Sequence, residues 1–188
     1  ALHYSWVTPD VLLLLIIMLM LGIFGYNFQV FTPLIAQFVL HTNSVGFGLL
    51  NSCQAVGSFF ASLGVAWLGN ATRRMVLTGA ACFSVVLFSL GLFGSWFLVV
   101  ALLTALGFTS SVFLSANNAR LQLITPPELR GRMMGIDALL IAGTTPIGSL
   151  IVGGMAQSAG VRPMLSTMGA LCILGVVAGL VYLQQMRD

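Results

Sequence analysis

Charge is what this sequence has least of. Eleven of its 188 residues are charged, seven arginines and four acids, and there is no lysine. Charged residues make up 6% of the chain, compared with about 25% in soluble domains. Hydrophobic residues make up 59%, and the mean hydropathy is +1.06. A chain this poor in charge is expected to lie in a lipid bilayer.

The absences also exclude most catalytic and nucleic-acid chemistry. Without lysine there is no P-loop for nucleotide phosphates, and the two histidines, His3 and His41, form no zinc-binding HExxH motif. Cys53, Cys82 and Cys172 lie in apolar runs without paired spacing, which indicates neither a disulfide nor a metal site. No basic patch is studded with aromatic residues. We therefore expect no enzyme activity, no cofactor, no metal and no nucleic-acid partner.

Six long apolar runs fill the chain instead. Each can cross a hydrocarbon core of about 30 Å as a helix that rises about 1.5 Å per residue. The runs show no alternation of polar and apolar residues, which excludes a membrane β-barrel. We predict an all-α polytopic membrane protein with six transmembrane helices, joined by short loops, over residues 9–40, 45–68, 75–93, 96–119, 126–158 and 163–185.

The arginines indicate how these helices are oriented in the membrane. An even number of spans places both ends of this segment on one side. If that side is the cytoplasm, only Arg162 falls on the outer side, which is a strong positive-inside bias. The cytoplasmic set, which would also meet anionic lipid, consists of Arg73, Arg74, Arg120, Arg130, Arg132 and Arg187.

Side-chain amides within the predicted spans are candidates for a transport cavity. Asn27 and Gln29 lie in the first span, Asn51 and Gln54 in the second, and Asn117 in the fourth. An amide at membrane depth costs free energy unless it faces protein or water, so we expect these five to line a cavity. The alternative is that they hold helices together through interhelical hydrogen bonds. The third and sixth spans lack such groups and are expected to face lipid.

Two prolines lie inside predicted spans. Pro33 and Pro146 remove backbone hydrogen bonds at membrane depth and are expected to kink their helices. Broken helices at this depth often mark transport sites, although a static kink is the alternative.

One acid, Asp137, is predicted to lie below the membrane surface, about one turn inside the fifth span. An ion pair with Arg120 or Arg132 is one interpretation of it. A proton-binding site in the transport path is the other.

The motif "TPPELRGRMMGI" gathers three of the few charges at the start of the fifth span. Thr125 and Glu128 have the spacing of a capping box, which predicts that the helix begins at Thr125. Glu128 suits the positive end of the helix dipole, whereas Arg130 and Arg132 oppose it. Topology and lipid phosphate are one explanation for these two arginines.

Four segments of the chain are distinctive together: "FGYNFQVFTPLIAQ" (24–37), "VGFGLLNSCQAVGSFFAS" (45–62), "QLITPPELRGRMMGI" (122–136) and "GTTPIGSLIVGGMA" (143–156). In this order they resemble the carboxyl-terminal six-helix half of a major facilitator superfamily transporter. The similarity is to the drug and siderophore efflux branch, which includes the enterobactin exporter and macrolide efflux proteins. A three-plus-three inverted repeat is typical of such a half.

The resemblance implies an export function. It implies a twelve-helix exporter in the bacterial inner membrane, whose amino-terminal six helices are the partner of this half. Such a protein moves a small drug-like or siderophore-like molecule out of the cell by alternating access, coupled to proton entry. The first and fourth helices would line the cavity, and the second and fifth would contact the other half. A half-size protein that homodimerises and a non-transporting membrane subunit are the alternatives.

The resemblance also implies a role for the start of the fifth span. In these transporters an acidic residue of the other half docks there when the protein faces outward. Glu128, Arg130, Gly131, Arg132 and Gly135 are therefore candidates for a latch between the halves that closes the cytoplasmic gate.

Overall fold

The computed structural model describes residues 8–68 and 71–185, in which every regular element is a helix. Six spans are long and apolar enough to cross a membrane, as the sequence predicts. The first span, Pro9–Val39, is divided into three elements. The elements are α2 (Pro9–Phe24), α3 (Phe28–Leu34), the π-helical segment η1 (Ile35–Val39), α4 (Ser44–Leu68), α5 (Arg73–Leu92), α6 (Trp96–Ile124), α7 (Pro127–Ala159) and α8 (Val161–Gln185).

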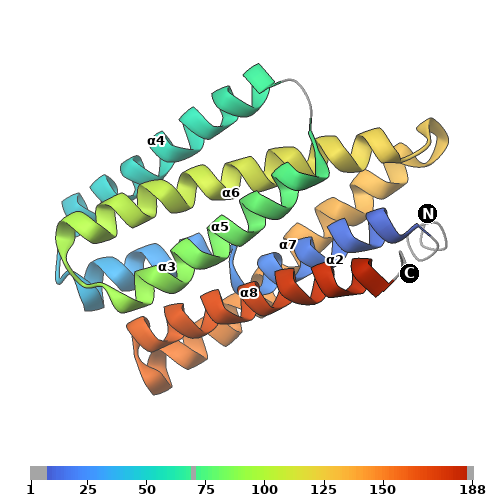
Figure 1. Cartoon of the computed structure of the whole chain (residues 1–188). Coiled ribbons are helices and arrows are strands. Elements are labelled where there is room, and N and C mark those ends of the chain that lie inside the picture. The colour runs from blue at the N-terminus through green and yellow to red at the C-terminus, as the bar shows by residue number, and fades with distance from the viewer. Residues whose placement is uncertain (1–7, 69–70, 186–188) are drawn as a thin grey trace.

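The helices form one elongated bundle in which α2 begins and α8 ends at the same end (Figure 1). The helix α2 packs against α7 and α8, whereas α6 packs against α4 and α5. A further large contact joins α5 to α8. The first helix of each three-helix set thus packs against the second and third helices of the other set. This exchange of partners is the pairing that a three-plus-three repeat predicts.

Glycines permit a close contact between two spans where α4 crosses α6. A Cβ atom at Gly57 would overlap the carbonyl oxygen of Thr104, and one at Gly107 would overlap that of Gln54. The hydroxyl of Ser58 donates to the carbonyl oxygen of Gly107 at 3.0 Å. Beyond this crossing, α4 diverges from α6 (Figure 1). The two backbones can approach this closely because neither glycine has a side chain.

The interruption of the first span is not where its proline predicts. The helix α2 ends at Phe24 and α3 begins at Phe28, several residues before Pro33. Pro33 lies inside α3, and the π-helical segment follows it. The sequence signal for the break is the glycine-containing tripeptide at 25–27, because glycine and asparagine favour turns.

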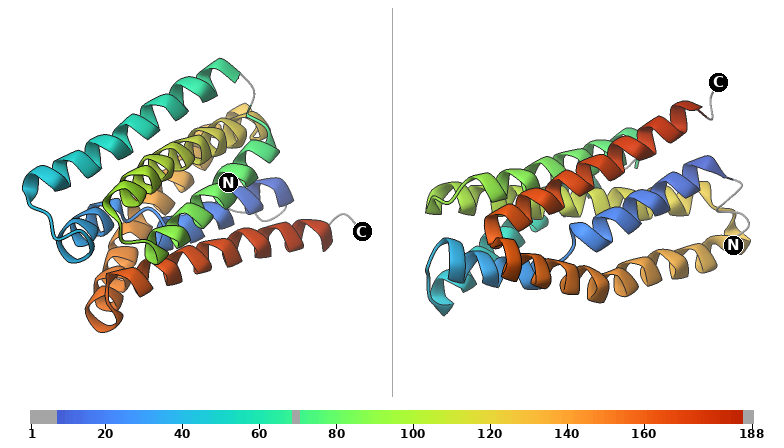
Figure 2. Two further views of the ribbon diagram at one scale, coloured as in Figure 1. Left: turned by 60° about the vertical axis from the view of Figure 1, so that its left-hand side comes forward. Right: turned by 90° about the horizontal axis from the view of Figure 1, so that it is seen from below.

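The helix α7 runs through Pro146 without interruption. The hydroxyl groups of the two threonines just before it donate hydrogen bonds to the helix backbone. Thr144 donates to the carbonyl oxygen of Leu140 at 2.5 Å, and Thr145 donates to that of Ile141 at 2.9 Å. Such bonds bend helices without breaking them. In the right-hand view of Figure 2, α7 is a single curved helix.

The predicted capping box is wrong. The helix α7 begins at Pro127, and its cap position is Pro126, which makes no side-chain cap bond. A residue before proline is held in an extended conformation, so neither Thr125 nor Pro126 can be helical. The hydroxyl of Thr125 instead donates to the carbonyl oxygen of Leu121 at 2.6 Å, in the last turn of α6. Thr125 therefore caps the end of α6 rather than the start of α7.

The crossing of α4 and α6 makes a testable prediction. Gly57→Ala is expected to lower the free energy of unfolding by about 1–3 kcal/mol, because the added methyl group overlaps the α6 backbone. Gly64→Ala is the matched control, since a Cβ atom there meets nothing within 4 Å. Unfolding in detergent micelles measures both. Equal stability of the two variants would contradict the close contact.

Candidate functional site

A polar groove lies between α3 and α4. Its volume is about 370 Å³, and three of the five predicted cavity amides, Gln29, Asn51 and Gln54, lie along it. Gln54 is buried, whereas Gln29 and Asn51 are exposed. Asn51 donates to the carbonyl oxygen of Phe47 at 3.1 Å. The remaining lining residues are Phe28, Phe47, Ala55 and Ser58. The groove can therefore offer amide donors and acceptors between two aromatic rings.

Asn27, also predicted to line a cavity, does not do so in this structure. It is 1% exposed, and its Nδ2 donates to the carbonyl oxygen of Ile23 at 2.7 Å. Its Oδ1 accepts a bond from the Ser149 hydroxyl at 3.3 Å. A Cβ atom at Gly148 would also collide with the Asn27 amide. Asn27 therefore supplies a hydrogen-bond donor to the carbonyl end of α2 and joins that end to α7. This is the alternative given above, in which the amides hold helices together through interhelical hydrogen bonds.

Tyr26 attaches the break at residues 25–27 to α5 and α6. Its ring stacks on Phe83 of α5 with centroids 5.3 Å apart and an angle of 12° between the planes. Its hydroxyl donates to the carbonyl oxygen of Ser110 in α6 at 2.8 Å. A Cβ atom at the neighbouring Gly25 would overlap the Phe83 ring. The break is therefore held by α5, α6 and α7 together.

Asn117 and Asp137 face each other between α6 and α7. Both are buried, and Asn117 Nδ2 donates to Asp137 Oδ1 at 3.3 Å. Asn117 thus lines no open cavity, and the predicted ion pair of Asp137 with Arg120 or Arg132 is absent from the described residues. Arg120 lies instead 3.9 Å from Asp10 of α2, and Arg132 is exposed.

Asp10 is the acid that gathers arginines at the end of the bundle where α2 begins. Its carboxylate accepts a bond from Arg73 at 3.2 Å, in addition to the longer contact with Arg120. These three residues join the starts of α2 and α5 to the last turns of α6. Sequence reasoning missed this cluster because the residues are far apart in the chain.

The candidate latch residues share one property, which is exposure at the start of α7. A Cβ atom at Gly131 or Gly135 would meet nothing within 4 Å, so a partner backbone has room to approach there. The exposed set is Glu128, Arg130, Gly131, Arg132 and Gly135.

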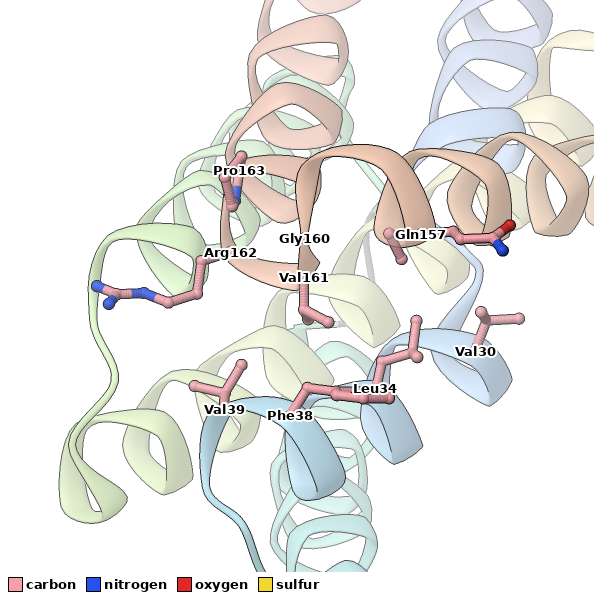
Figure 3. Close-up of a pocket in the computed structure, with 11 residues that line it drawn as sticks. Val30, Leu34, Phe38, Val39, Gln157, Gly160, Val161, Arg162 and Pro163 are labelled. Carbon is pink, nitrogen blue, oxygen red and sulfur yellow. The ribbon is translucent and has the colours of Figure 1, made fainter.

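A second cavity, with a volume of about 690 Å³, lies at the opposite end of the bundle. Figure 3 shows Val30, Leu34 and Phe38 on one side of it and Val161 facing them from the turn between α7 and α8. Arg162 points away from the cavity and donates to the carbonyl oxygens of two residues at the end of α5, Gly91 and Leu92. The remaining lining residues are Val39, Gly153, Ala156, Gln157, Gly160 and Pro163. This cavity is therefore almost entirely apolar, and sequence reasoning did not predict it.

The contact between Asn27 and Ser149 makes a testable prediction. Asn27→Ala is expected to lower the free energy of unfolding by about 1–3 kcal/mol, because it leaves a buried carbonyl oxygen without a donor. A double-mutant cycle with Ser149→Ala should give a coupling of about 0.5–1 kcal/mol. Ser158→Ala is the control, since that hydroxyl bonds only within α7. Strict additivity of the first two variants would exclude the contact.

Comparison with known proteins agrees with this architecture. The Major Facilitator Superfamily profile matches residues 14–188. The chain is 25% identical over 191 residues to the multidrug efflux pump Tap of Mycolicibacterium fortuitum. The aligned region covers 100% of this chain and 46% of Tap. It thus spans about half the length of the curated relative it matches. No solved structure matches it. The family match covers nearly the whole chain, and this multi-pass membrane protein belongs to the major facilitator superfamily.

Proposed function

We propose that the chain is the carboxyl-terminal half of an exporter that moves a small organic molecule across the bacterial inner membrane. The observation that carries this proposal is the polar groove between α3 and α4, which places Gln29, Asn51 and Gln54 together in a chain of this family. Polar side chains at membrane depth that face a groove rather than lipid are candidates for a substrate path. The likeness to a multidrug efflux pump supports export and a drug-like substrate, rather than a siderophore.

A second six-helix unit is part of the proposal. In α4 and in α7, only 17% of the most apolar stretch of the helix is buried within this chain. In the other four spans the corresponding share is 33–56%. These two helices therefore present the faces on which another unit would pack. The amino-terminal half of the same transporter is the proposed partner, and a second copy of this chain is the competing possibility. The mass of the denatured polypeptide distinguishes the two, because a full transporter is one chain of about twice this length and a homodimer separates into two chains of this length.

The proposed orientation places the start of α2 and the end of α8 in the cytoplasm. Five arginines of the described residues lie near that end of the helices, whereas Arg162 lies at the opposite end. Positive charge is retained on the cytoplasmic side during membrane insertion. In this orientation the polar groove and the apolar cavity lie toward the outer side, and the candidate latch faces the cytoplasm.

The coupling proposed is entry of protons in exchange for substrate. Alternating access then requires that the cytoplasmic end close while the outer end opens. Arg130 and Arg132 support a latch at that end, because both are exposed beside glycines that leave room for a partner backbone. An acidic residue of the other half would dock between the two guanidinium groups and the positive end of α7.

Replacing the groove amides tests the substrate path. The double variant Gln29→Leu with Gln54→Leu is expected to raise the ethidium concentration at half-maximal efflux about tenfold, because polar contacts to the substrate are lost. Gln122→Leu is the matched control, since Gln122 is exposed near the cytoplasmic end of α6 and lines neither cavity. Unchanged efflux in the double variant at equal expression would sink this assignment.

Neutralising the arginines tests the latch. Arg130→Ala with Arg132→Ala is expected to favour the inward-facing state, because the cytoplasmic contact is weakened. A thiol placed at the exposed Ala138 position should then react about fivefold faster with a membrane-impermeant reagent applied from the cytoplasmic side. Arg74→Ala is the control, because Arg74 is exposed at the same end of the bundle. Equal reaction rates in all variants would argue against a latch.

A further inference from the structure

A buried acid and a buried amide form an incomplete pair between α6 and α7. Asp137 is 1% exposed and Asn117 is 0% exposed. One hydrogen bond joins them, from Asn117 Nδ2 to Asp137 Oδ1 at 3.3 Å. Asn117 Oδ1 is buried and has no hydrogen-bond partner. A buried oxygen without a donor is costly, so this atom requires an explanation.

None of the described arginines compensates a charge on Asp137. Arg120, one turn beyond Asn117 on α6, lies beside Asp10, and Arg73 bonds to the same carboxylate. An ionised Asp137 would therefore be enclosed at membrane depth without a cation.

The other titratable groups on the packed elements are weak acids. Tyr26, from the break in the first span, lies close enough to interact with a charge on Asp137. Cys172 of α8 is buried. Neither group can supply a positive charge.

A proton on Asp137 satisfies both members of the pair. A carboxylic acid and a primary amide can form two parallel hydrogen bonds, one from N–H to the acid carbonyl and one from O–H to the amide carbonyl. The first of these bonds is present in the structure. A hydroxyl at Asp137 Oδ2 would supply the second and would donate to Asn117 Oδ1, the atom that lacks a partner.

On the basis of the export function proposed above, we propose that Asp137 and Asn117 form the proton-binding site of this six-helix unit. The site holds its proton while α6 and α7 are packed together. When the helices part, water enters, the O–H bond of Asp137 breaks, and water takes the proton and leaves a hydrated carboxylate. Parting costs little packing, because α6 makes most of its contacts with α4 and α5 rather than with α7.

Infrared difference spectroscopy tests proton binding independently of transport. The protein expressed from its complete coding sequence is placed in phosphatidylethanolamine and phosphatidylglycerol vesicles. The wild type should show a protonated-carboxyl band that Asp137→Asn removes and Asn117→Leu shifts. Identical carboxyl bands in the wild type and Asp137→Asn would overturn the proposal. Asparagine mimics the neutral acid, so a failure of Asp137→Asn to fold would also overturn the proposal. Asp137→Glu should keep the protonated-carboxyl band.

Transport tests whether this proton is coupled to export. In Asp137→Asn, ethidium movement driven by a pH gradient should fall about tenfold or more, whereas ethidium exchange at equal pH should stay within about twofold of the wild type. Ser84→Ala is the control, because this buried serine bonds only to its own helix. Wild-type coupling in Asp137→Asn would overturn the role of the site. If the wild type itself exports nothing, the proposed function fails, and the infrared result still decides proton binding.

Discussion

Hydrocarbon offers no hydrogen-bond partner, and this constraint bears on the places where the helices end or break. Several of these places are closed by a side chain from nearby. Thr125 donates to the last turn of α6, and Arg162 donates to the end of α5. Asn27 donates to the free carbonyl at the break in the first span. These polar side chains therefore supply donors that the backbone lacks where helices end or break, and polar residues without such a role are candidates for function.

The same constraint explains why the break and the prolines are separate. A proline within a helix removes one donor, which neighbouring threonines and a local π-helical turn can accommodate. A true break frees several groups and needs a larger set of partners. Residues 25–27 have them, because Tyr26 reaches α6 and Asn27 reaches α7. Gly25 and Gly148 let α5 and α7 approach the break closely. Tertiary contacts, and not the prolines, therefore decide where the first span is interrupted.

Sequence reasoning recovered the features that depend on distance along the chain. Apolar length predicted six spans, and the arginine pattern predicted which helix ends carry positive charge. It failed where the answer depends on which face of one helix meets which face of another. One of the two interpretations of Asp137 was an ion pair with Arg120 or Arg132, but Arg120 lies beside Asp10 and Arg132 is exposed. Likewise Asn27 and Asn117 resembled Gln29 and Asn51 in sequence, but they lie on buried faces.

The short helix α3 separates two unlike cavities and lines both of them. Gln29 lies on the polar groove beside α4, whereas the next residue, Val30, lies on the apolar cavity beside the turn between α7 and α8. The break at residues 25–27 frees α3 from the straight path of α2, and the contacts of Tyr26 and Asn27 then fix it. A shift of α3 toward α4 would narrow the polar groove and widen the apolar cavity. The two cavities therefore share α3 as a common wall, and the contacts at the break hold that wall in place.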